Sequence, residues 1–119
     1  MDNPVTNKRK GFAMRMGRFE RDEEVLVDVI NCAEQPELNN TSLACRTVDV
    51  SEHGMKMKSA IHIPVDTQLA LRLDLDSVRY RLEGEVRWCK EEGESYIGLL
   101  IHNSSQDIIP WTRMFRSGL

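Results

Sequence analysis

The sequence predicts an all-β fold, a six-stranded antiparallel barrel with one C-terminal α-helix. Residues 69–76 and 78–89 both alternate between apolar and polar side chains, which is the period of a strand with one buried face. The last segment instead places apolar residues at helical spacing, at Ile108, Trp111 and Phe115. About six strand-like runs suit a small barrel, because closure removes the exposed edges that promote aggregation.

Three strands are expected in the first half of the chain. Valines recur at every second position from Val25 to Val29, and β-branched residues favour strands. A polar segment that contains a proline predicts a loop over residues 34–42. The next two strands are expected over residues 43–50 and 55–59, with a turn between them.

The longest alternating run carries two aromatic residues on one face. Tyr80 and Trp88 are separated by an even number of positions, so an uninterrupted strand directs both side chains to the same side. We expect both aromatic rings in the core rather than on a ligand surface.

A hairpin and a helix complete the predicted fold. A glycine-containing turn over residues 91–94 is expected to lead into a last strand over residues 95–102. The serine pair 104–105 is expected to cap the terminal helix. Pro110 would strain that helix unless the first helical turn begins close to it.

Length, charge and cysteine content narrow the class of protein. At 119 residues, 40% of them hydrophobic, the chain is expected to form one domain with a real core. The formal net charge of -3 argues against a DNA-binding protein, because affinity for duplex DNA depends on neutralising many phosphates. Three cysteines without metal-ligand spacing favour a reducing cytoplasm. No apolar run approaches the roughly 20 residues of a membrane span, so no membrane insertion is expected.

No set of residues predicts catalysis or a bound metal. The three histidines are scattered and show no ligand spacing with cysteines or carboxylates. Ser51 lacks the glycine-flanked elbow of a nucleophilic serine, and a hydroxyl that stabilises a turn is the better interpretation. We therefore expect no enzyme activity and no cofactor.

The amino-terminal segment is basic and lacks a clean period. Residues 1–22 are expected to form a flexible arm that orders against the domain or a ligand, and residues 23–119 to form the barrel domain with its helix. Arg15, Arg18 and Arg21 recur at spacings of three. They either share the solvated face of a helix or serve as ligand-binding groups in an extended arm.

A D-x-S-x-x-G hexapeptide, residues 49–54, separates two strand-like runs and is called the motif turn below. Asp49 and Ser51 carry short oxygen-bearing side chains that bond either nearby backbone or a ligand, and Gly54 is expected to supply a positive φ. The downstream strands contain the sequences Leu82-Glu83-Gly84-Glu85-Val86-Arg87-Trp88 and Tyr96-Ile97-Gly98. This ordered set resembles the PilZ domain, a bacterial module, over most of the chain.

The resemblance implies a β-barrel that binds the second messenger cyclic di-GMP without catalysis. In that family an R-x-x-x-R pair precedes the first strand, whereas no two arginines of this amino-terminal segment stand four apart. If Arg21 is the second arginine of the pair, Gly17 occupies the first position and Arg18 is adjacent. The expected ligand-binding residues are Arg15, Arg18, Arg21, Asp49, Ser51 and Gly54.

Two functions follow from the resemblance. The first is a stand-alone cytoplasmic receptor for cyclic di-GMP, whose arm orders on the ligand and regulates a protein partner. The alternative is a degenerate homologue that does not bind nucleotide and acts as a protein-interaction adaptor in pilus or flagellar control.

Overall fold

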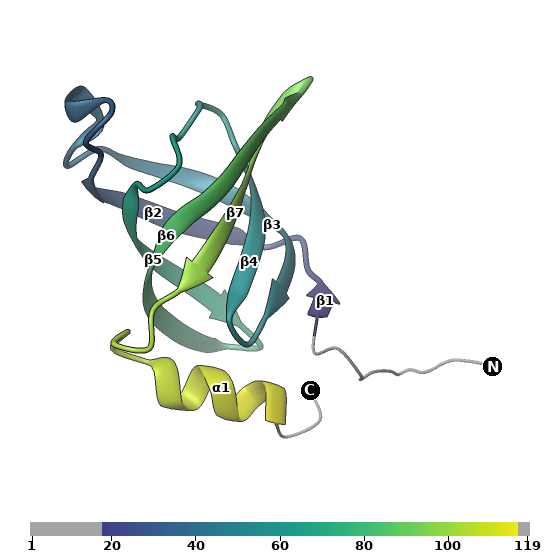
Figure 1. Cartoon of the computed structure of the whole chain (residues 1–119). Coiled ribbons are helices and arrows are strands. Elements are labelled where there is room, and N and C mark those ends of the chain that lie inside the picture. Colours follow the sequence, from purple (N-terminus) through teal and green to yellow (C-terminus); the bar gives the residue numbers. More distant parts are fainter. Residues whose placement is uncertain (1–17, 117–119) are drawn as a thin grey trace.

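Six antiparallel strands close into a barrel in the computed structural model, which describes residues 18–116 (Figure 1). The sheet order is β1-β3-β2-β5-β6-β7-β4, and pairing of β3 with β4 closes the ring. The elements in chain order are β1 (Arg18–Glu20), β2 (Glu24–Asn31), the 3-10 turn η1 (Pro36–Leu38), β3 (Ser42–Ser51), β4 (Gly54–Ser59), β5 (Gln68–Leu75), β6 (Val78–Glu92), β7 (Glu94–Ile101) and α1 (Ile108–Arg116). The expected barrel with a C-terminal helix is confirmed.

The short strand β1 lies outside the closed ring and pairs with β3 alone among the described strands. Its three residues belong to the segment 1–22 that the sequence predicts to be an arm, so the last part of that segment is a strand. Antiparallel pairing sets Arg18 opposite Ser51 and Glu20 opposite Asp49. The carboxyl end of the basic segment therefore runs alongside the motif turn.

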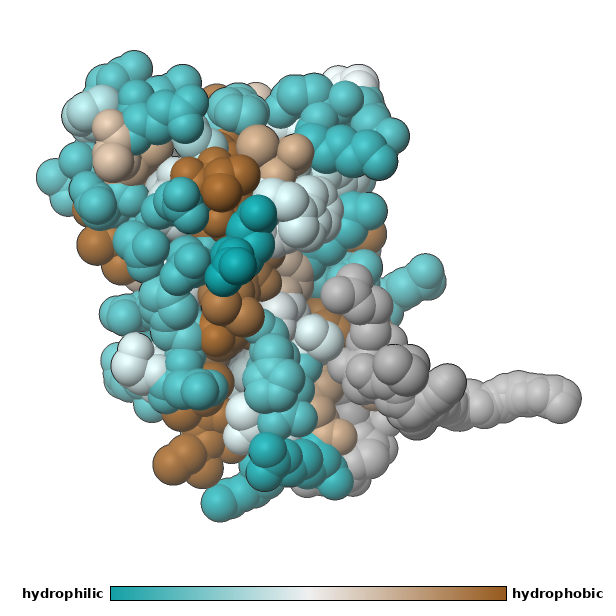
Figure 2. Space-filling model, viewed as in Figure 1, coloured by the Kyte–Doolittle hydropathy of each residue, from teal (hydrophilic) through white to brown (hydrophobic). Residues whose placement is uncertain are grey.

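Helix α1 packs across one end of the barrel (Figure 1). Trp111 is fully buried, and its ring makes edge-on contacts with Tyr80 at 5.3 Å and Phe115 at 5.1 Å between centroids. On the face seen in Figure 2, hydrophilic residues surround a narrow band of apolar ones. The strand alternation thus fills the interior while the helix covers an open end.

The start of α1 differs from the expected serine cap. The hydroxyl of Ser105 accepts a hydrogen bond from the Glu83 backbone N–H at 2.8 Å and donates to the His102 carbonyl at 2.7 Å, so it bonds β6 and its own loop. The helix begins at Ile108, which places Pro110 in the first turn, where a missing N–H breaks no helical bond.

The expectation that Trp88 is a core residue is wrong. The register of β6 against β7 shifts between Val86 and Trp88, and such a bulge turns the following side chain to the other face of the sheet. Trp88 is consequently 41% exposed on the outside of the barrel, whereas Tyr80, before the bulge, is 6% exposed.

Candidate functional site

Ser51 closes the motif turn through its side chain. The Ser51 hydroxyl accepts a hydrogen bond from the Gly54 N–H at 3.2 Å and lies 3.1 Å from the Gly54 carbonyl, to which it donates. A further bond from the Ile101 N–H to the His53 carbonyl, 2.9 Å long, ties the turn to the end of β7. The turn is therefore fixed from within and from the neighbouring strand.

Gly54 is required for a reason other than the one expected from the sequence. Gly93 is the glycine with positive φ in the described part of the chain, and Gly54 is not. A Cβ atom at Gly54 would lie 2.7 Å from the Leu99 carbonyl oxygen, a backbone atom that cannot rotate away. Gly54 thus permits the close approach of β4 and β7 beside the turn.

The described candidate residues fall into two groups. Asp49 is partly buried in β3 and lies opposite Lys56 of β4 in the strand register, and Arg18 of β1 lies opposite Ser51 in the same way. Arg21 instead directs its guanidinium to two carboxylates, Glu23 at 3.3 Å and Asp76 at 3.6 Å.

The Arg21 side chain is only 23% exposed in that arrangement. Arg15 lies outside the described residues. The structure therefore brings Arg18 to the motif turn and places Arg21 in ion pairs elsewhere.

An open hollow of about 280 Å³ lies beside the motif turn on the outer surface of the barrel. Its lining combines Ser51, His53 and Gly54 of the motif turn with cationic, aromatic and small side chains from three strands. Among the lining residues are Ser51, Gly54, Lys56, Arg87, Trp88 and Gly98. We call this feature the outer hollow.

Trp88 forms an aromatic platform in the outer hollow. Its ring lies over Gly98, where an added Cβ would come within 2.0 Å of the indole nitrogen. The Lys56 ammonium lies 6.0 Å from the Trp88 ring centroid and 5.2 Å from that of Tyr96, within cation–π range. A flat apolar surface and a cation are thus held close together on β4, β6 and β7.

Sequence reasoning missed Lys56, Arg87 and Trp88 as candidate residues. Lys56 follows the motif turn at an outward position, so its proximity could have been noticed from strand alternation. The exposure of Trp88 depends on the bulge, for which the local sequence gives no distinct signal.

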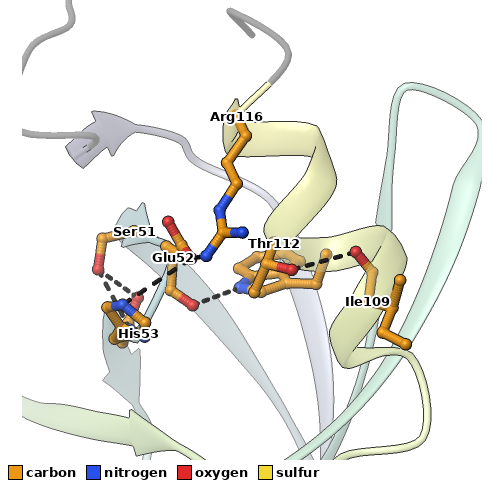
Figure 3. Close-up of polar contacts among 8 residues, drawn as sticks. Ser51, Glu52, His53, Ile109, Thr112 and Arg116 are labelled. Carbon is orange, nitrogen blue, oxygen red and sulfur yellow. Dashed lines mark hydrogen bonds and ion pairs between the residues drawn. The ribbon is translucent and has the colours of Figure 1, made fainter. Parts of the chain in front are cut away.

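The motif turn is also bonded to α1. The Trp111 indole N–H donates to the Glu52 carbonyl at 3.1 Å, and the Arg116 guanidinium lies 2.8 Å from the Glu52 carboxylate (Figure 3). Figure 3 shows Glu52 between the turn and the helix, with Arg116 directed toward it. Residues more than fifty positions apart in the sequence therefore meet at the turn.

No group of three or more histidine, cysteine or carboxylate side chains in residues 18–116 is placed to hold a metal ion. Over the same range, no helix has the length and apolar character needed to cross a membrane.

The sequence and the fold both match known proteins. A model of the PilZ domain family matches residues 18–109. No curated protein sequence matches the chain significantly.

Three solved structures share this architecture. The Bacillus subtilis inhibitor of motility, MotI (DgrA), aligns with a TM-score of 0.66 and 12% sequence identity over 88% of this chain and 51% of that one. The PilZ domain of CeSA from a cellulose-synthesizing bacterium gives a TM-score of 0.59 and 17% identity, over 84% of this chain and 95% of that one. The PilZ domain of Escherichia coli YcgR, solved with cyclic di-GMP, gives 0.61 and 14%, over 93% of this chain and 91% of that one.

The chain spans about half the length of MotI. At these sequence identities the structural matches establish the fold.

Proposed function

Because this chain belongs to the PilZ domain family, we propose that it is a non-catalytic receptor for cyclic di-GMP in bacterial second-messenger signalling. The observation that carries the proposal is the outer hollow, where the motif turn adjoins an aromatic platform and two cations. The related fold of YcgR, which was solved with cyclic di-GMP, supports the same ligand class.

The ligand's chemistry matches the groups in the outer hollow. Cyclic di-GMP offers flat purine rings and anionic phosphodiesters. An exposed Trp88 ring suits purine stacking, which contributes about 1–3 kcal/mol per base in nucleic-acid complexes. Lys56 and Arg87 suit the phosphates, since both ammonium and guanidinium groups donate charge-assisted hydrogen bonds.

The motif turn and the arginines supply base recognition in this proposal. Asp49 suits the amino groups of guanine, and an arginine forks onto the guanine O6 and N7 atoms. Arg18 is the leading arginine because its backbone is paired with Ser51. Arg15 remains a second candidate. For Arg21 to take part, the ligand has to compete with Glu23 and Asp76.

In this proposal, ligand engagement by these arginines orders the part of the basic segment that precedes β1 against the barrel, since residues 18–20 already pair with β3. We propose that this ordering changes the surface offered to a protein partner in the bacterial cytoplasm. The segment thus links nucleotide concentration to a protein contact.

The adaptor without nucleotide is the second candidate function. The ion pairs of Arg21 favour it, because they occupy one of the three arginines expected to bind the ligand. Glycine at position 17, in place of the first arginine of the family pair, favours it as well.

Calorimetric titration of cyclic di-GMP into the full chain distinguishes the two functions. The receptor predicts binding with a micromolar dissociation constant that Arg18→Ala weakens about 5- to 150-fold, the loss of one bidentate contact of roughly 1–3 kcal/mol. Arg79→Ala is the matched control, because Arg79 is exposed and pairs with Asp74 on the β5–β6 hairpin. No heat and no thermal stabilisation by excess ligand would leave the adaptor function.

A further inference from the structure

Helix α1 holds the motif turn through groups that do not line the outer hollow. The Glu52 carbonyl accepts the Trp111 indole N–H at 3.1 Å, and the Glu52 carboxylate pairs with Arg116 at 2.8 Å. None of these three residues lines the outer hollow. The helix therefore restrains the turn and leaves the hollow accessible.

The same helix also contacts the strand that carries Arg18. The Phe19 ring of β1 stacks on Phe115 of α1 with 5.7 Å between centroids. Phe115 in turn packs against Trp111, which is fully buried. One helix thus contacts β1 directly and the motif turn at the end of β3 through Glu52.

Restraint at Glu52 bears directly on the geometry of the turn. Glu52 lies between Ser51 and Gly54, which both line the hollow. The Trp111 hydrogen bond fixes the orientation of the peptide group that follows Glu52, because that group contains the accepting carbonyl. A binding site whose backbone is already fixed loses less conformational freedom on binding, and its affinity is correspondingly higher.

Building on the proposed function, we propose that Trp111 and Arg116 are positioning residues for the nucleotide site, and that ligand binding and α1 docking stabilise each other. Thermodynamic linkage makes this coupling reciprocal. If docking of α1 increases ligand affinity by some factor, ligand binding increases the equilibrium constant for α1 docking by the same factor. The loss of one net hydrogen bond changes an equilibrium constant, here the ligand affinity, by a factor of about two to ten.

Trp111→Phe is the principal variant, since it removes the indole donor and keeps an aromatic ring beside Tyr80 and Phe115. Arg116→Ala is the second variant. Because the arginine side chain is 73% exposed, folding should be preserved, and the loss of ligand affinity should be at most about fivefold. Ile63→Val is the matched control, since it trims a fully buried side chain outside α1 and the motif turn.

The first measurement needs no ligand and so does not depend on the proposed function. Amide hydrogen exchange is followed at Gly54 and Ile101, whose N–H groups bond within the motif turn, and at Val29 and Asn40, whose N–H groups bond near η1. Trp111→Phe should accelerate exchange at the turn about two- to tenfold relative to the other two amides. Unchanged exchange at the turn, or an equal acceleration at all four amides as in a general loss of stability, would overturn the positioning role.

The second measurement adds cyclic di-GMP to the full chain. In the wild type, the ligand should slow exchange of the Trp111 amide, which bonds to the carbonyl of Asp107, the residue just before α1. Trp111→Phe should lower ligand affinity about two- to tenfold and reduce this protection, whereas Ile63→Val should change neither. Binding without slower exchange in α1, or with faster exchange there, would overturn the coupling; absence of binding would refute the receptor function and leave the ligand-free result to decide the positioning role.

Discussion

Replacing Gly98 by alanine tests the aromatic platform, because the Trp88 ring packs directly on Gly98. A Cβ at this position would lie 2.0, 2.1 and 2.6 Å from three atoms of the Trp88 indole, distances that no rigid arrangement can hold. Since Trp88 is already 41% exposed, its ring can rotate into solvent, and the fold should survive. The free energy of unfolding should fall by about 1–2 kcal/mol, the lower range for overpacking.

Gly98→Ala should also weaken ligand binding. If Trp88 stacks on a purine, moving its ring away removes about 1–3 kcal/mol, which is roughly a 5- to 150-fold increase in the dissociation constant for cyclic di-GMP. Titration calorimetry gives the affinity, and tryptophan emission, compared with that of Trp88→Phe, reports whether the Trp88 ring has moved. Unchanged affinity despite a shifted Trp88 emission would refute stacking; unchanged emission would refute the packing of Trp88 on Gly98.

Three further predictions concern the surroundings of the site. Gly54→Ala should lower the free energy of unfolding by about 1–3 kcal/mol in a denaturant titration, because its Cβ would press on the Leu99 carbonyl and open the β4–β7 pair; wild-type stability would contradict this packing. Thr47→Val should lower the free energy of unfolding by about 1–3 kcal/mol in the same titration, because the buried hydroxyl accepts from the Glu23 N–H at 2.9 Å and donates to the Arg21 carbonyl. An unchanged free energy of unfolding would show that water replaces the hydroxyl. Hydrogen bonds from Ser95 and then His62 hold the pKa of Glu91 below its ordinary value of 4.5, so Ser95→Ala should raise that pKa in an NMR titration. A carboxyl with a lowered folded pKa adds stability above the ordinary pKa and loses it as pH falls through the folded pKa, so the melting temperatures of wild type and Ser95→Ala should converge as pH falls below 4.5, and a difference that does not change with pH would contradict the assignment.

Strand positions could be predicted because one buried face imposes a two-residue period. The valines from Val25 to Val29 are each buried, and so are the leucines from Leu69 to Leu75, as their alternation predicts. The helix spacing of Trp111 and Phe115 was equally informative. These features depend on local periodicity, which a sequence carries directly.

The details of the site depend on contacts between distant segments. One inserted residue in β6 turns Trp88 outward, and the alternation of the sequence continues unbroken through that bulge. Gly54 is explained by the Leu99 carbonyl of another strand rather than by its own backbone angles. The bond from Trp111 to Glu52 joins segments 59 residues apart, so no local pattern could indicate it.

Mapping cyclic di-GMP onto the full chain by NMR chemical-shift perturbation tests the central claim most directly. If the outer hollow is the nucleotide site, the largest shifts should cluster at the motif turn and on the β4, β6 and β7 residues around Lys56, Trp88 and Gly98. No shifts at high ligand concentration, or shifts concentrated away from these strands, would contradict the assignment of this surface as a cyclic di-GMP receptor.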